Sequence, residues 1–519
     1  MSLKGTLVDV AAVTTDRPPV LDDRAMFGHP RGLALLFVVE MWERFSYYGM
    51  RALLVLYLVN ALNWSDGDAA RLYGAYTGLV YLTPLIGGYL ADRLIGTRRS
   101  LVIGGVIIAL GHFALAFGPG AVEGEIALKD TAGLLPFYLG LALVVIGTGF
   151  FKPNVSTMVG QVYREGDPRR DSGFTIFYMG INLGAFLAPL VCGYLGQRVG
   201  WHYGFGAAGV GMVLGLIIYM WGRDRYLPGI GIHARHDPSN AAAVAAESIE
   251  EPWNPWAVLI SATVGAGLVF LGAGDIHPVD LTIRMAIAGM GVAAAVLAIS
   301  GTRGEERNRV IALFIVVFFV IFFWMAFEQA GSSMNLFADR HTNLNVGGFE
   351  MPSSWFQSMG PLFILIFAPV FAILWTVLER RGNEPSTALK MVLGLVLLGV
   401  GFLFLVVAGR SVDRGMQVSA MWLTMAYLFH TLGELCLSPV GLSYVTKVAP
   451  YKFASLLMGA WFLANAAANY LGGFLAAQTE TVTSQARFFS IPVATSFGAA
   501  FLLLLLVPLL KRLTRSVKA

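Results

Sequence analysis

The sequence predicts an all-α integral membrane protein with fourteen transmembrane helices, arranged as two groups of six with two additional helices between the groups. Of its 519 residues, 56% are hydrophobic and 13% are charged, and the mean hydropathy is +0.67. A spanning helix needs roughly 20 mostly apolar residues, and many windows of the chain reach that length. This composition excludes an ordinary water-soluble protein.

The charged residues and the cysteines exclude several functional classes. The net charge of +4 is small for this length, and the basic residues are scattered among short loops, so nothing favours nucleic-acid binding. Cys192 and Cys436 lie in apolar segments without ligand spacing, which argues against a disulfide framework or a metal site. The first thirty residues contain four aspartates and no uninterrupted apolar core, so we expect no cleavable signal peptide.

The apolar segments divide the chain into six parts. Six spans are expected near 31–60, 70–94, 100–119, 132–160, 172–197 and 203–222, two more near 255–274 and 280–301, and six more near 308–338, 354–379, 386–409, 416–448, 453–477 and 487–510. The expected parts are an N-terminal cytoplasmic segment (1–30), a six-helix bundle (31–222), a cytoplasmic linker (223–252), two additional helices (253–303), a second six-helix bundle (304–510) and a cytoplasmic tail (511–519).

Basic residues in the loops predict the orientation. Alternate loops, counted from an inside N-terminus, collect Arg93, Arg98, Arg99, Arg164, Arg169, Arg170, Arg223, Arg225, Arg303, Arg307, Arg309, Arg380, Arg381, Lys447 and Lys452. The opposite loops are acidic or carry isolated arginines. Because short loops rich in Lys and Arg stay in the cytoplasm, we expect both termini there and the protein in the cytoplasmic (inner) membrane.

The first span carries four ionisable groups in its middle. Glu40, Glu43, Arg44, Tyr47 and Arg51 fall largely along one face of a helix with 3.6 residues per turn. A charge at the bilayer centre costs about 2.5–3.5 kcal/mol on insertion scales and normally faces a cavity or a partner. We therefore expect this stripe to line an interior path. The alternative is a self-neutralising patch that only holds helices together.

Three other spans carry isolated charges. Lys152, Glu328 and Glu434 each lie in an apolar setting with no opposite charge within four residues. Each must find a partner on another helix or change its protonation state, unless it lies near the interface and reaches water there. His430 lies one turn before Glu434 and either tunes it or serves as a structural residue.

Two six-helix groups joined by a polar linker suggest a transporter with its substrate site between the halves. The stretch "GGYLADRLIGTRRS" places Asp92 and Arg93 at a helix end before a basic pair. It resembles the loop between the second and third helices of the major facilitator superfamily, where such charges form a cytoplasmic network. An ordinary positive-inside loop is the alternative.

Six motifs in order carry a more specific resemblance. They are "ExxERFSYYGMR", "FFKPNVSTMVGQVY", "DSGFTIFYMGINLGAFLAPLVCGYLG", "GWHYGFGAAGVGM", "EQAGSSMNLFADR" and "GELCLSPVGLSYVTKVAP". Together they resemble the proton-dependent oligopeptide transporters, a branch of the major facilitator superfamily whose bacterial members carry two extra helices between the bundles. The resemblance implies a major facilitator fold and a proton-coupled symporter that imports di- and tripeptides by alternating access, driven by the proton gradient without a cofactor.

The resemblance also assigns roles to particular residues. It implies proton coupling by Glu40, Glu43, Arg44, Lys152 and Glu328. It implies a peptide site formed by Arg44, Tyr47, Tyr48, Arg51, Tyr81, Lys152, Asn182, Trp324, Glu328, Glu434 and Trp461. It implies two gating ion pairs, Arg51 with Glu328 and Lys152 with Glu434. The expected partners are small peptides, protons and membrane lipid, and the expected functional unit is a monomer.

Two positions depart from the family pattern. Phe327 stands where many members have an acidic residue before Glu328, and Gly360 in "FQSMGP" replaces an asparagine that helps hold the peptide amine. The part of the site that would hold the peptide amine is therefore less polar here. The alternative is a proton-coupled facilitator for another small solute, such as a peptide-like drug, an amino-acid derivative or nitrate. A membrane enzyme is not expected, because His202 and His341 are isolated loop residues and no GxSxG motif is present.

Overall fold

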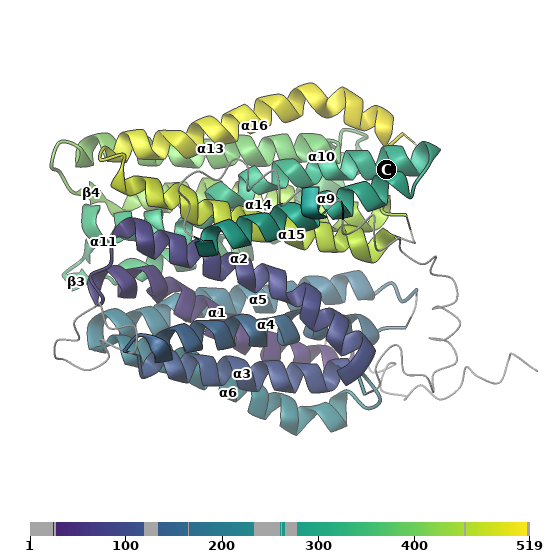
Figure 1. Ribbon diagram of the computed structural model, residues 1–519, viewed down its shortest axis with the longest axis horizontal. Helices are drawn as coiled ribbons and strands as arrows, with labels where there is room; N and C mark the ends of the chain where they lie inside the picture. Colours follow the sequence, from purple (N-terminus) through teal and green to yellow (C-terminus); the bar gives the residue numbers. More distant parts are fainter. Residues whose placement is uncertain are drawn as a thin grey trace, which may run out of the picture.

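A computed structural model describes residues 24, 27–118, 133–164, 166–232, 260, 262–264, 278–450 and 453–515 of the chain. Within these ranges the chain is almost entirely helical, which confirms the predicted all-α class (Figure 1). The expected linker at 223–252 and the expected span near 255–274 lie largely outside the described residues.

The N-terminal bundle contains six long helices. They are α1 (Arg31–Asn60), α2 (Asp66–Leu90), α3 (Thr97–Ala116), α4 (Leu135–Gln161), α5 (Arg170–Ala188) and α6 (Trp201–Tyr226). Short π-helical turns extend α2 (η3, Ala91–Ile95) and α5 (η4, Pro189–Gly193, and η5, Leu195–Val199). Pro189 stands where α5 ends, because proline cannot donate the next helical hydrogen bond.

One additional helix and the C-terminal bundle follow. They comprise α9 (Pro278–Ser300), α10 (Gly304–Phe327), the 3₁₀ turn η6 (Glu328–Gly331), α11 (Ser333–His341), the 3₁₀ turn η7 (Ser353–Ser358), α12 (Met359–Arg380), α13 (Thr387–Val412), α14 (Ala420–Val448), α15 (Ala454–Ala477), the 3₁₀ turn η9 (Gln478–Glu480) and α16 (Gln485–Leu513). Four two-residue strands lie in the connections: β1 (Thr342–Asn343), β2 (Asn345–Val346), β3 (Phe349–Glu350) and β4 (Val418–Ser419). β1 pairs with β4 in parallel and β2 with β3 antiparallel.

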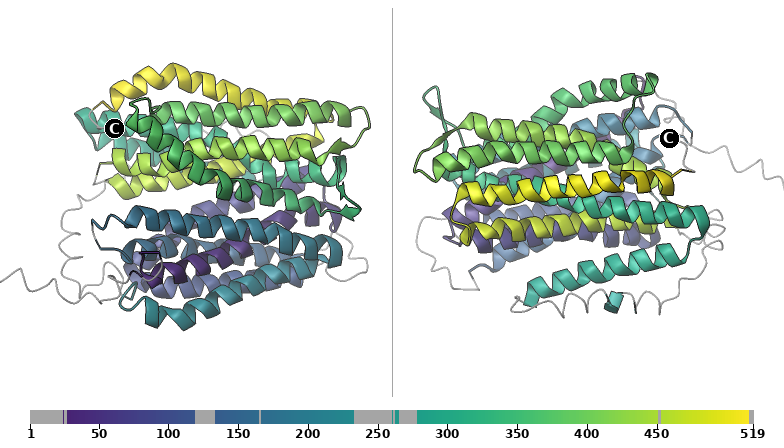
Figure 2. Two further views of the ribbon diagram at one scale, coloured as in Figure 1. Left: turned by 180° about the vertical axis from the view of Figure 1, so that it is seen from behind. Right: turned by 90° about the horizontal axis from the view of Figure 1, so that it is seen from above.

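The two bundles lie side by side. In Figure 1 the purple-to-blue helices α1–α6 form one half and the green-to-yellow helices the other, with α2 beside α15 where the halves meet. The turned views in Figure 2 show the same division. We call the end that carries α11, β3 and β4 the latch end, and the opposite end, where α16 finishes, the tail end.

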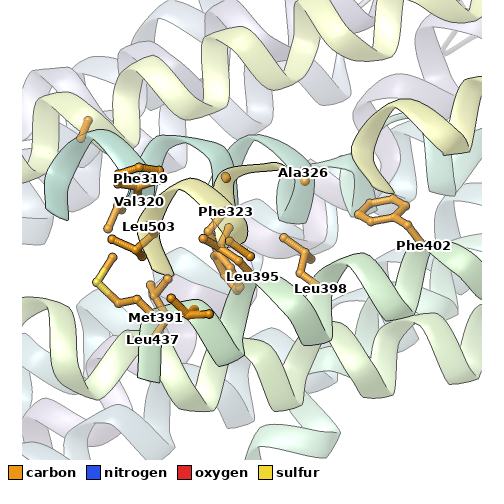
Figure 3. Close-up of a cluster of buried hydrophobic side chains, with 14 of the residues drawn as sticks. Phe319, Val320, Phe323, Ala326, Met391, Leu395, Leu398, Phe402, Leu437 and Leu503 are labelled. Carbon is orange, nitrogen blue, oxygen red and sulfur yellow. The ribbon is translucent and has the colours of Figure 1, made fainter. Parts of the chain in front are cut away.

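Apolar side chains fill the interior of each bundle. In the C-terminal bundle, buried side chains of α10, α13, α14 and α16 interdigitate (Figure 3), among them Phe323, Leu395, Leu437 and Leu503. Nine described helices are long and apolar enough to cross a membrane. Large apolar side chains are also exposed on outer faces, as at Ile366 and Ile373 of α12, which is the pattern expected where lipid replaces water.

Candidate functional site

The charged stripe of α1 lies in the interior of the molecule. Glu40, Glu43, Arg44 and Arg51 are each at most 7% exposed. Arg44 Nε lies 3.0 Å from a carboxylate oxygen of Glu40, and the same guanidinium pairs with Glu43. Two acids therefore share one arginine. Protonation of either acid would remove one of the two negative charges that neutralise Arg44.

An ion pair made by the last residue of this stripe joins the two bundles. Arg51 of α1 pairs with Glu328, the first residue of η6. The helix α10 tightens into a 3₁₀ turn at this position, and both partners are buried. The expected contact between Arg51 and Glu328 is thus present in this conformation, and it connects the halves through two desolvated charges.

Tyr73 of α2 completes this pair, and the sequence reasoning missed it. Arg51 Nε donates a hydrogen bond of 2.5 Å to the Tyr73 hydroxyl. A Cβ on Gly331 would lie 1.8 Å from that hydroxyl, so the glycine leaves the space that the tyrosine occupies. The signal in the sequence was the recurrence of Tyr73, Tyr76 and Tyr81 in one expected span.

Lys152 of α4 faces the same cluster. Its Nζ lies 3.9 Å from the ring centroid of Tyr81, which is a cation–π contact. Lys152 also interacts electrostatically with Arg44 and Glu43. The structure therefore brings the isolated lysine of the fourth helix to the α1 stripe, although the two segments are more than 100 residues apart.

Glu434 of α14 lies near the same cluster, where Glu328 and Tyr48 are among its charged and polar neighbours. Its carboxylate accepts a hydrogen bond from Tyr178 of α5. The expected pair between Lys152 and Glu434 is not among the ion pairs of the described residues. The reason lies in their present neighbours, because the lysine covers Tyr81 while the glutamate faces Tyr178. His430, one turn before Glu434, packs on Phe402 with ring centroids 4.4 Å apart.

Aromatic side chains surround these charges. The rings of Tyr47 and Tyr48 meet edge to face at 5.1 Å, and each lies 5.6 Å from an arginine of α1. The Asn182 amide donates to the carbonyl of Tyr178, which is its own i−4 position. In the C-terminal bundle, Trp461 of α15 is buried.

The two departures from the family pattern lie in the C-terminal bundle. Phe327 stacks on Phe323 and meets Trp324 edge to face with centroids 5.2 Å apart. A Cβ on Gly360 would meet only the Thr431 hydroxyl, at 3.7 Å. Position 360 therefore has room for a Cβ atom.

Polar side chains fasten the bundles together at the latch end, a feature the sequence analysis did not single out. The Arg340 guanidinium binds both carboxylate oxygens of Asp66, at 2.6 and 2.8 Å. Asp339 accepts hydrogen bonds from Asn60 at 3.0 Å and from Ser353 at 2.7 Å. These contacts join α1 and α2 to α11 and η7, which closes this end.

Gln197 in η5 extends the same set of contacts. Its amide nitrogen donates to Ser353 at 2.7 Å, and its amide oxygen accepts from the backbone N–H and the hydroxyl of Ser354. Next to it, Arg198 pairs with Glu350 of β3 at 3.1 Å. Both sides of the N-terminal bundle are thus tied to the C-terminal bundle at the latch end.

The tail end carries the basic loops. Arg98 of α3 pairs with Asp224 of α6 at 2.8 Å, and Arg93 lies over the Tyr89 ring at 4.9 Å. The Arg169 side chain and backbone N–H donate to Asp167, which lowers the pKa of that carboxyl to about 2. The predicted role of Asp92 concerns a side chain outside the described part of the structure.

Metal-binding groups are absent from the described residues, in which no three His, Cys, Asp or Glu side chains cluster. Cys192 and Cys436 are both buried as free thiols. The chemistry available at the site is therefore that of ion pairs, hydrogen bonds and aromatic faces.

Comparison with known proteins identifies the family. The sequence profile of the POT family matches residues 98–497. The chain is 41% identical over 511 residues to the uncharacterized transporter YclF of Bacillus subtilis, covering 95% of this chain and 97% of that protein. It is 36% identical over 506 residues to a di-/tripeptide transporter of Lactococcus lactis subsp. cremoris, covering 94% and 97%.

A solved structure is similar over nearly the whole chain. The crystal structure of a mutant peptide transporter POT in complex with alafosfalin superposes with a TM-score of 0.77. It is 38% identical and covers 94% of this chain and 96% of that one. The chain belongs to the POT family of transporters.

Proposed function

We propose that this protein is a proton-coupled symporter that imports di- and tripeptides by alternating access. The observation that carries the proposal is the buried pair between Arg51 and Glu328, which links the two bundles beside the cluster formed by Arg44, Glu40 and Glu43. Buried charges of this kind are costly in a membrane and normally mark an ion or substrate pathway.

The chemistry of a short peptide fits these groups. A peptide carries an ammonium at one end and a carboxylate at the other, with variable side chains between them. Arg44 and Lys152 supply cations for the carboxylate, and Glu328 and Asn182 supply acceptors for the ammonium. Charge-assisted hydrogen bonds at both ends fix the length of the peptide, while the tyrosines between them tolerate many side chains.

We place the tail end in the cytoplasm of a cell with an inner membrane. This end carries Arg98 at the start of α3, Arg169 just before α5 and Arg225 at the end of α6, and short connections rich in Arg stay inside. The latch end then faces outward, and its contacts between the bundles hold the outer side together in this conformation. We further propose that a monomer carries out transport without a cofactor.

Proton coupling follows from the ion pairs. Protonation of Glu328 weakens its hold on Arg51, and protonation of Glu40 or Glu43 releases Arg44 or Lys152 to meet the peptide carboxylate. Each event biases the equilibrium between two arrangements of the bundles. The membrane potential supplies about 2.3 kcal/mol per proton per 100 mV, and the pH difference across the membrane adds to this driving force.

A pair between Lys152 and Glu434 belongs to the opposite state in this scheme. Closure of the tail end would bring α4 and α14 together and allow that pair to form, while the Arg340 to Asp66 contact at the latch end opens. The Lys152 to Glu434 pair then holds the conformation with a closed tail end, and the Arg340 to Asp66 contact holds the conformation with a closed latch end.

Uptake of labelled dialanine and trialanine into proteoliposomes tests the proposal. Wild-type protein and Lys152→Ala are compared with and without an inward proton gradient, and counterflow measures exchange without net driving force. We expect gradient-driven uptake by the wild type that the substitution abolishes, with exchange partly surviving. Absence of peptide movement by the wild type, with another solute found bound, would refute the peptide assignment and make Phe327 and Gly360 the first residues to examine.

A further inference from the structure

Arg284 is the one charged residue between positions 281 and 300, which form most of helix α9. It is the seventh residue of the helix, about 9 Å along the axis from the first. Arginine at such a depth commonly extends toward the interface to keep its charge hydrated. The direction in which the Arg284 side chain points therefore shows whether it extends to the interface or contacts a neighbouring helix.

Arg284 turns to α15. Its Nε donates a hydrogen bond of 3.1 Å to the Tyr470 hydroxyl, and its guanidinium carbon lies 5.0 Å from the centroid of the Phe474 ring. Figures 1 and 2 show α9 on the outside of the C-terminal bundle next to α15. Two contacts of the same guanidinium, one turn apart on α15, fix the position of that helix relative to α9.

The same part of α15 also forms the contact between the bundles. A Cβ on Gly78 of α2 would lie 3.3 Å from Tyr470 Cβ, and one on Gly74 would lie 3.0 Å from the Tyr470 carbonyl oxygen. Tyr470 therefore touches α9 through its hydroxyl and α2 through its backbone and Cβ.

The same turn of α15 is also connected to the proton-coupling pair. The Gln329 amide donates a hydrogen bond of 2.9 Å to the Gly472 carbonyl, and Gln329 directly follows Glu328. A shift of η6 when Glu328 releases Arg51 would therefore be transmitted to α15 two residues from Tyr470.

We infer that Arg284 is a positioning residue for transport. Through Tyr470 it holds α15 in its position against α2, and α9 thereby stabilises the helix at which the two bundles contact each other. The inference rests on the proposed function, because the movement it assists is the alternation of the two bundles. It gives the additional helix a task in the transport cycle beyond lipid contact.

The test combines Arg284→Gln, Tyr470→Phe and the double variant in proteoliposomes. Tyr470→Phe keeps the ring against α2 and removes only the hydroxyl, and Arg414→Gln, an exposed arginine at the latch end, serves as control. Wild-type uptake is measured first, so that failure of the proposed function is separated from failure of this inference. The readouts are the maximal rate of gradient-driven trialanine uptake, the counterflow KM and the midpoint of thermal unfolding.

Each single variant is expected to lower the maximal rate by about threefold to tenfold, the range a single hydrogen bond supports, with KM and the unfolding midpoint unchanged. Tyr470→Phe removes the hydrogen bond alone, whereas Arg284→Gln also removes the contact with the Phe474 ring. The double variant should therefore match Arg284→Gln and show no additional loss. Unchanged rates would overturn the inference. So would losses that multiply in the double variant, or that follow a fall in the unfolding midpoint, since these indicate independent or purely structural effects.

Discussion

Gly74 of α2 and Gly473 of α15 face each other across the two bundles so closely that a Cβ on Gly74 would lie 2.7 Å from the Gly473 Cα. Small residues at such positions let helix backbones approach in a membrane, where van der Waals packing replaces the hydrophobic effect. The contact between the bundles thus depends on the absence of a side chain at these positions.

Gly74→Ala should shift the protein away from the conformation with a closed latch end, because the backbone of α15 cannot yield as a flexible side chain would. We expect the distance between spin labels on Asn63 and Val346, both exposed at that end, to move to a longer population. Gly498→Ala is the control, since its Cβ would meet nothing within 4 Å. An unchanged distance distribution in Gly74→Ala would contradict this account.

Glu328→Gln should uncouple transport from the proton gradient. The amide mimics the protonated acid, so Arg51 loses its charged partner permanently and the pair can no longer respond to a proton. Breaking a buried pair typically costs 3–5 kcal/mol, and we expect gradient-driven uptake to fall by about 100-fold or more while counterflow changes about threefold or less. Glu305→Gln, exposed at the start of the same α10, should leave both unchanged. Retention of gradient-driven uptake in Glu328→Gln would disprove the coupling scheme.

Gly360→Asn should strengthen peptide binding, because it introduces the amide of the family pattern at a position where a Cβ meets no clash. The expected result is a KM for dialanine lower by about threefold to tenfold, the effect of one added hydrogen bond. Gly360→Ala, which fills the space without an amide, should leave KM unchanged. If both variants behave alike, the polarity of this position does not control affinity.

Asp413→Asn should weaken the start of α16. The carboxylate accepts hydrogen bonds from the Ser484 hydroxyl at 2.6 Å and from the backbone N–H of Gln485 at 2.7 Å. Burial disfavours the charged form, but these hydrogen bonds outweigh it and hold the pKa of Asp413 below its ordinary value. Loss of a cap of this kind costs about 1 kcal/mol.

The pH dependence follows from the direction of that pKa. A lowered folded-state pKa means that the stabilisation is complete above the ordinary aspartate value and is lost as pH falls through the folded-state value. Thermal unfolding in detergent should therefore separate wild type from Asp413→Asn at pH 6, with the two curves converging at acid pH. A constant difference down to the most acidic pH at which the protein stays folded would assign the effect to another cause.

The sequence alone determined the class of protein and the position of its costly groups. Windows of about 20 apolar residues are sufficient to predict spanning helices, because a bilayer accepts little else. The stripe from Glu40 to Arg51 was predicted to be interior for the same reason: charges cannot face lipid cheaply. The motifs around it then predicted the family.

Only the tertiary structure decided which of these groups meet. Tyr73 on Arg51, Gln197 on Ser353 and Ser354, and Arg284 on Tyr470 join residues 22 to 186 positions apart, and their contacts depend on the rotation and packing of whole helices. The conformation also selects among alternatives, since Glu328 is paired while Lys152 and Glu434 are apart. The sequence pattern predicts each helix but not these partners, because the rotation of a helix and its packing against distant segments are set only when the whole chain folds.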